Sequence, residues 1–236
     1  MKKLMGLIYK DIIQMKSSLI INMVLDLLFI LISAISIITF NETLNEEIPL
    51  DSLDYAVEFI ANSIGFMFVI ILLPYTLVLN SISIDEKSNF TRFLLSTGCK
   101  RQTIINEKVL FGLILSAPGI LFSVVIFLIL FMMNGNPYIT PVLCIAYFAY
   151  TVLAMVFLIT ITILYSTIFS SISNQAIGAV VFMIIAGLLY AGLFLSTLFI
   201  GTETINYFLF GVSGALLALS LGAYFASIKV YQHKDF

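Results

Sequence analysis

The chain has 236 residues, of which 61% are hydrophobic and only 10% are charged, and its formal net charge at pH 7 is −2. A soluble globular domain usually has about 25% charged residues, so these polar residues are too few to cover a soluble fold of this size. The apolar blocks are continuous and do not alternate with polar residues, which excludes a membrane β-barrel. The composition therefore predicts an all-α membrane protein with several spans.

The first 18 residues predict an amphipathic helix ahead of the first span. Their apolar residues recur at spacings of three and four, while Lys3, Lys10, Gln14 and Lys16 lie largely off that stripe. A basic helix of this kind lies in the headgroup plane, with its lysines near anionic lipid. We expect the bend into the first span at Ser17–Ser18, and the helix either only anchors the chain or also contacts a partner. The stripe consists of Leu4, Ile8, Ile12, Met15 and Leu19.

Six apolar blocks follow this helix. Each has at least the ~20 residues that a helix needs to cross a ~30 Å hydrocarbon core. The second and fourth blocks are longer, so they are expected to tilt or to extend beyond the bilayer. The sequence thus predicts one transmembrane domain over residues 1–236, with spans at 19–40, 56–84, 109–133, 142–169, 176–200 and 207–228.

The distribution of charge supports the count of six spans independently of hydropathy. All 11 lysines and arginines fall in residues 2–16, 87–108 and 229–234, which six spans place on one side of the membrane. The segments on the other side carry acidic residues and no basic one. By the positive-inside rule both termini are cytoplasmic, and the chain is expected in the cell membrane as a multi-pass protein.

The cytoplasmic loop of residues 85–108 is predicted to hold a short helix. Ser88 or Asn89 has a side-chain oxygen that can accept from the free N–H groups at the start of a helix. Gly98 is a natural stop, because glycine accepts the left-handed conformation that ends helices. A second helix is expected to begin near Lys100–Arg101 and to run into the third span.

The short helix is predicted to have two different faces. Its helical spacing groups Phe90, Phe93, Leu94 and Thr97 on one face, and Thr91, Arg92 and Ser96 on the other. The aromatic face either contacts a partner protein or sinks into the membrane interface.

This loop carries a family resemblance. The pattern "DEK…F…FLLSTG…KRQ.I…K" within Asp85–Lys108 resembles the first cytoplasmic loop of type-2 ATP-binding-cassette (ABC) exporter permeases. The segment "IYKDIIQMKSS" is similar to the N-terminal elbow helix of that family, and "SIKVYQHKDF" is similar to its usual ending. Many members have a proline before the basic pair, where this chain has Gly98–Cys99.

The resemblance implies a contact with a separate ATPase subunit that would hold the helix around Phe90–Gly98. Phe93 and Leu94 would fill a groove on the ATPase, with Arg92, Lys100 and Arg101 at its rim. The full set of contact residues implied in this way is Asp85, Glu86, Lys87, Phe90, Arg92, Phe93, Leu94, Gly98, Lys100 and Arg101.

The resemblance also implies partners and cofactors. Family permeases work in pairs, so a second copy or a related permease is expected beside the ATPase dimer and the lipid bilayer. ATP and Mg²⁺ would be bound by the ATPase, because this chain has no nucleotide-binding motif. We therefore expect no cofactor in this chain, no nucleic-acid partner, and no enzyme activity of the chain by itself.

The spans contain few polar groups that would recognise cargo. Asp26 is the one acid clearly inside a predicted span, and such residues usually face the bundle or a cavity. It either hydrogen-bonds to the helix that carries Asn80 and Ser81 or lines a cargo pathway together with Asn80. The apolar lining suits a hydrophobic or amphipathic cargo, such as a peptide, that is exported. A stripe of small residues in the last span, Gly211, Ala215, Ala218, Gly222 and Ala226, predicts close helix packing.

Two other functions remain alternatives at this point. An ion-coupled secondary carrier usually needs titratable groups near the bilayer midplane and often has inverted repeats, and neither is evident in this chain. The other alternative is a membrane scaffold or sensor subunit that transports nothing.

Overall fold

In the computed structural model, the described residues lie in helices joined by short turns, and no strand occurs among them. They confirm the all-helical prediction, while most of the first, second and fifth predicted spans lies outside them. The structure describes residues 2–21, 23–24, 28, 77–133, 141–169, 180–181, 184–185, 187–189, 191 and 204–233. The helices with defined bounds are α1 (Lys2–Gln14), α4 (Phe90–Ser96), α5 (Arg101–Met133), α6 (Pro141–Ile168) and α8 (Ile205–His233).

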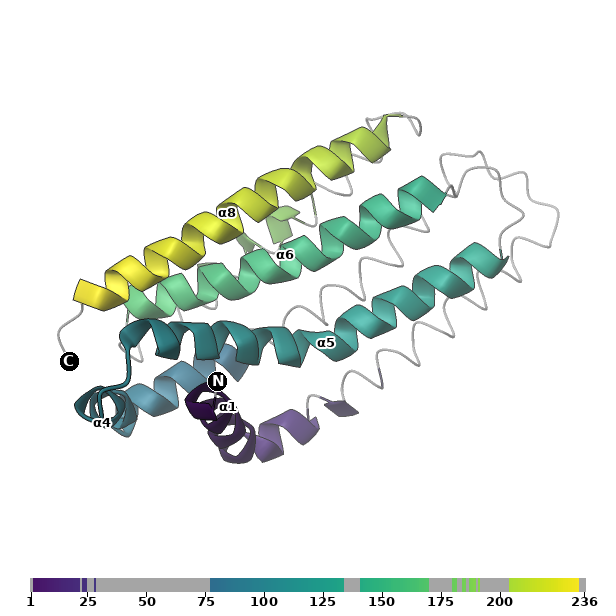
Figure 1. Ribbon diagram of the computed structural model, residues 1–236. Helices are drawn as coiled ribbons and strands as arrows, with labels where there is room; N and C mark the ends of the chain where they lie inside the picture. Colours follow the sequence, from purple (N-terminus) through teal and green to yellow (C-terminus); the bar gives the residue numbers. More distant parts are fainter. Residues whose placement is uncertain are drawn as a thin grey trace.

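The long helices lie side by side, and the short ones gather at one end (Figure 1). α8 packs along α6, α5 contacts both of them, and α1 packs against α5. Among the described residues, Ile145–Ile168 and Ile205–His233 are long and apolar enough to cross a membrane. These two segments correspond to the predicted spans 142–169 and 207–228. The total of six spans and the cytoplasmic position of both termini stay predictions.

α8 packs within the chain through a face other than the small-residue stripe. Its buried residues recur at steps of four or three, which is the spacing of a left-handed helix seam. Gly211 and Gly222 of the predicted small-residue stripe lie outside this seam and are exposed in the single chain, so close packing of the stripe against another helix stays a prediction. Ser220 and Ser227 donate to carbonyls four residues earlier, at 2.7 Å each. Their hydroxyls are therefore satisfied within α8, which lets small serines serve as packing positions. The seam consists of Ile205, Leu209, Ser213, Leu216, Ser220, Ala223, Ser227 and Tyr231.

A glycine makes the close approach between α5 and its neighbours possible. A Cβ atom on Gly112 would lie 2.8 Å from Cγ2 of Ile159 in α6 and 3.1 Å from Cγ2 of Val78. Both neighbours are β-branched and stiff at χ1, so they cannot easily move aside. This position needs glycine for space and not for an unusual backbone angle.

We expect Gly112→Ala to lower the free energy of unfolding by about 1–2 kcal/mol, because overpacking outweighs the better helix propensity of alanine. The measurement is thermal unfolding in detergent, followed by circular dichroism. Gly214→Ala is the matched control, since nothing lies within 4 Å of that position, and it should be neutral or stabilising. Equal melting temperatures for the two variants would contradict the close approach.

The N-terminal helix departs from its predicted course in two places. α1 ends at Gln14, and the helix is interrupted at Met15, not at the predicted Ser17–Ser18. Met15 is buried in the same apolar cluster as Ile8, so packing determines where the break falls. The predicted apolar stripe is right except at Ile12, which is 37% exposed, while Asp11 is 1% exposed.

The loop around α4 forms as predicted at its end and differently at its start. Gly98 has φ 74°, and its N–H donates to the Leu95 carbonyl at 3.1 Å, which confirms the predicted stop. Asn89 occupies the N-cap position but makes no side-chain cap hydrogen bond. The capping prediction is therefore wrong, because Asn89 has φ 54° where a capping residue needs an extended backbone. Ser88 Oγ donates backwards to the Ile84 carbonyl at 2.8 Å.

Candidate functional site

α4 presents a single large apolar side chain at the surface. Phe93 is 60% exposed, and Arg92 and Ser96 beside it are exposed as well. The two predicted faces are wrong in detail, because Thr91 is 4% exposed and Phe93 shares the outer side with Arg92. Leu94 packs against the buried apolar cluster. Thr91 and Leu94 thus pack the inner side of α4 against the rest of the chain, and Phe93 is exposed on its outer side.

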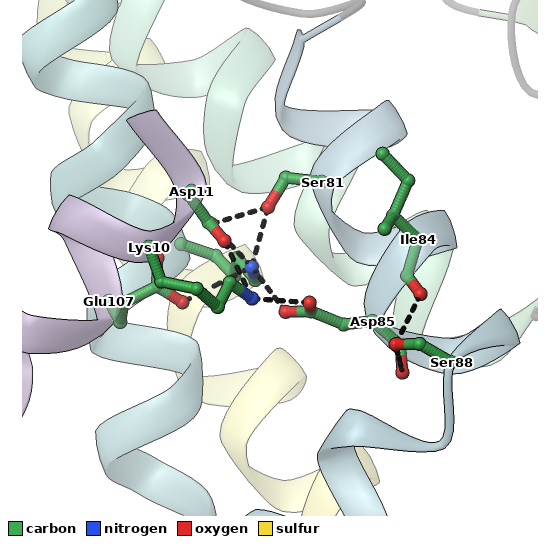
Figure 2. Close-up of polar contacts among 8 residues, drawn as sticks. Lys10, Asp11, Ser81, Ile84, Asp85, Ser88 and Glu107 are labelled. Carbon is green, nitrogen blue, oxygen red and sulfur yellow. Dashed lines mark hydrogen bonds and ion pairs between the residues drawn. The ribbon is translucent and has the colours of Figure 1, made fainter. Parts of the chain in front are cut away.

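Beneath α4 lies a buried group of charged side chains, here named the ion cluster (Figure 2). It joins three segments that are far apart in the sequence. Lys10 and Asp11 come from α1, Asp85 from the helical segment 77–87, and Glu107 and Lys108 from α5. No sequence motif predicted that these five residues would meet, although Lys10, Asp85 and Lys108 were each noted in the sequence.

Lys108 is the centre of the ion cluster, and its side chain is 3% exposed. Its Nζ lies 2.6 Å from Asp11 Oδ2 and 2.7 Å from Asp85 Oδ2, and it donates to Ser81 Oγ at 2.5 Å. Burial on its own would lower the pKa of Lys108, but the carboxyl groups of Glu107, Asp11 and Asp85 outweigh burial and raise that pKa above its usual value. Lys108 is therefore permanently charged, and its ammonium group donates a hydrogen bond to each of Asp11, Ser81 and Asp85.

Asp11 is the second fully buried charge. Its Oδ2 accepts from Ser81 Oγ at 2.5 Å, and its Oδ1 lies 2.8 Å from Lys10 Nζ. Burial opposes ionisation, but the Lys108 ammonium and the hydrogen bonds to the Asp11 carboxylate lower the pKa of Asp11 to about 2. Lys10 also pairs with Asp85, so each lysine contacts both aspartates.

Glu107 differs from the two aspartates. It is 2% exposed, its Oε2 lies 3.3 Å from Lys108 Nζ, and its Oε1 has no hydrogen-bond partner. Burial, with a further contribution from Asp11, raises the pKa of Glu107 to about 8, although Lys108 acts in the opposite direction. Glu107 is thus mainly protonated at neutral pH. The ion cluster then carries two positive and two negative charges, which is the balance that a buried site requires.

A second set of polar contacts ties the start of α5 to the end of α8. Arg101 Nη1 donates to the carbonyls of Tyr231 and Gln232, at 2.9 and 2.6 Å. Tyr224 donates to Asn106 Oδ1 at 2.7 Å. An arginine on the last carbonyls of a helix is favourable, because those groups lack partners within the helix.

The residues predicted to contact an ATPase are divided by the fold into an inner and an outer group. Asp85 is buried in the ion cluster, Arg101 is engaged with α8, and Phe90, Leu94 and Glu86 are half-buried. The outer group consists of the exposed residues Lys87, Arg92, Phe93, Gly98 and Lys100. Their contact with an ATPase stays a prediction.

Of the two residues predicted to line a cargo pathway, the described residues include Asn80. Asn80 is exposed on the helical segment 77–87, and Asp26 lies outside the described residues. The sequence interpretation missed Asp11 and Glu107, and it named Ser81 only on the helix expected to contact Asp26. The sequence held one signal for Asp11: it lies three residues after Ile8 and four before Met15, which places it on the apolar face of the helix.

The ion cluster has no metal character. Within residues 77–133 and the other described segments, no group of His, Cys, Asp and Glu is arranged to hold a metal ion. The ammonium groups of the two lysines lie among the carboxylates instead. The charges of the cluster therefore pair with one another and join the helices that carry them.

Two described helices are long and apolar enough to cross a membrane, and buried charge gathers beside the short helix α4; both features point to a helical membrane protein. A family model described as "ABC-2 family transporter protein" matches residues 54–232. The chain belongs to this family and is a membrane protein with transmembrane helices. Its family resemblance is thereby confirmed, and membership implies an ABC ATPase as partner in general terms. Searches of curated proteins and of solved structures found no match.

Proposed function

We propose that this chain is the permease subunit of an ATP-driven exporter that moves a hydrophobic or amphipathic cargo out of the cell. α4 is the helix through which a separate ATPase, which binds ATP and Mg²⁺, drives the transport cycle. The observation that carries this proposal is Phe93, a large aromatic side chain that is 60% exposed on a helix anchored from beneath. Exposed aromatic side chains with a fixed base are typical binding anchors.

The distribution of charge supports the proposed topology, and the family resemblance supports the proposed pairing of two permease chains. The chain has six spans with both termini in the cytoplasm, so that α1, α4 and the end of α8 lie at the cytoplasmic surface. α1 lies at the membrane interface with Met5, Tyr9 and Ile13 exposed, which suits a helix with one side in lipid. Two permease chains, identical or related, bind one ATPase dimer, and cargo passes near Asp26 and Asn80.

Phe93→Ala is expected to weaken binding of the partner ABC ATPase by about thirtyfold, since loss of an aromatic anchor typically costs about 2 kcal/mol. The measurement is the affinity of the purified permease for that ATPase. Arg92→Ala should also weaken ATPase binding, but by less than Phe93→Ala does. Leu94 is not a suitable test, because it packs against the buried cluster and its loss would disturb the fold.

The matched control is Phe225→Ala in α8, where the ring is 64% exposed. This variant should bind the ATPase as the unaltered chain does. If Phe93→Ala and Phe225→Ala bind equally well, α4 is not the contact. A permease reconstituted with the ATPase that shows no ATP-dependent efflux of any amphipathic peptide would contradict the proposed export.

A further inference from the structure

α4 needs support from other parts of the chain to keep its position. It has seven residues, and isolated helices of that length are not stable in water. Its N-terminus lacks a side-chain cap, which usually contributes about 1 kcal/mol. Thr91 and Leu94 anchor the middle of α4 against the core, so the open question is what holds its first turn.

Lys10 of α1 contacts that first turn. Its Nζ lies 4.2 Å from the centre of the Phe90 ring, within the range of a cation–π contact. The same ammonium group pairs with Asp85, 75 residues away in the sequence, and lies 2.8 Å from Asp11. The Lys10 side chain is 25% exposed, so water weakens these contacts only in part.

The position of Lys10 differs from that of Lys108. Lys108 is enclosed by the ion cluster and is not in contact with a ring of α4, whereas Lys10 lies at the outer edge and faces both the cluster and Phe90. Asp11 and Asp85 keep Lys108 as a partner if Lys10 is replaced. The two lysines therefore have separable roles, one in balancing buried charge and one in placing α4.

We propose that Lys10 is a positioning residue that holds the first turn of α4 against α1, through Phe90 and Asp85. The orientation of α4, and with it the direction in which Phe93 points, then depends on α1. Any effect of Lys10 on ATPase binding rests on the function proposed above. The contact between Lys10 and α4 is independent of that proposed function. A movement of α4 would be passed to α1 first, because the two are joined by this side chain.

Hydrogen exchange of the full chain in lipid nanodiscs tests the link without an ATPase. Lys10→Met should raise the exchange rate of the amides in Phe90–Ser96 about tenfold, by loss of the ring contact and of the ion pairs with Asp85 and Asp11. Lys10→Arg should keep the slow exchange, because a guanidinium group can also pair with Asp85 and stack on Phe90. Lys16→Met, at an exposed lysine just beyond α1, should change nothing in α4. Unchanged exchange of α4 in Lys10→Met would overturn the proposal.

Phe90→Leu provides a second variant that keeps every ion pair. It should raise exchange in α4 in the same direction, and the effects of Lys10→Met and Phe90→Leu should be smaller together than their sum. Full additivity would count against the contact. In the ATPase-binding assay, Lys10→Met should weaken binding while Lys10→Arg restores it. Faster exchange with unchanged ATPase binding would support the link and count against α4 as the ATPase contact.

Discussion

Replacing Lys108 with methionine is expected to lower the free energy of unfolding by about 3–5 kcal/mol. Lys108 lies within hydrogen-bond distance of Asp11, Asp85 and Ser81, with its side chain 3% exposed. Methionine would fill most of the same volume but would leave buried carboxylates short of a counter-charge. A substitution that leaves a buried charge unpaired is among those that destabilise a protein most.

Thermal unfolding in detergent at pH 7, followed by circular dichroism, measures this effect. Lys100→Met is the matched control, since Lys100 is exposed, and it should leave the free energy of unfolding within about 0.5 kcal/mol of that of the unaltered chain. The double variant Lys108→Met with Asp85→Asn should recover part of the loss, because it removes one of the unpaired charges. If Lys108→Met and Lys100→Met unfold alike, Lys108 is not the centre of a buried cluster.

The second large effect is a loss of stability as the pH rises, caused by Glu107. The folded chain binds the Glu107 proton with a pKa of about 8, against an ordinary value of 4.5. Between these values the unfolded chain releases that proton and the folded chain keeps it. Raising the pH therefore favours unfolding across this window, by about 1.4 kcal/mol per pH unit for a group of this kind.

Glu107→Gln should abolish most of this pH dependence, because the amide stays neutral and has nearly the same shape. The two proteins should melt at similar temperatures near pH 5, and the variant should be clearly more stable near pH 9. Asp11, which acts on Glu107 from α1, and Lys108 beside it are left in place by this change. A variant that loses stability with pH as steeply as the unaltered chain would show that another group is responsible.

The sequence predicted the larger features of the protein well. Its apolar composition and blocks predicted helices, and α5, α6 and α8 correspond to three of the predicted spans. Gly98 predicted the end of α4, and Lys100–Arg101 predicted the start of α5. These features depend on local properties, namely backbone freedom at glycine and hydropathy over a window of residues, so a single stretch of sequence is enough to indicate them.

The site depends on contacts that no local pattern contains. Asp11 and Lys108 are 97 residues apart, and Lys10 and Asp85 are 75 residues apart. A charged residue in an amphipathic segment is expected to face water, because burying it alone is unfavourable. Burial becomes acceptable only when residues of opposite charge arrive from other helices. For the same reason the sequence did not indicate which face of α8 packs within the chain, since that seam depends on the neighbour that packs against it.

The sequence by itself therefore determined that this is a helical membrane protein with its basic residues in three segments, and its loop motif indicated the family. The tertiary structure decided which of those charges are exposed and which are internal. Phe93 and Arg92 lie on the outside of α4, while Lys10, Asp11, Asp85, Glu107 and Lys108 join α1, the helical segment 77–87 and α5 beneath it. The physical reason is that the desolvation of each charge is offset only by its partners, and those partners are brought together by folding.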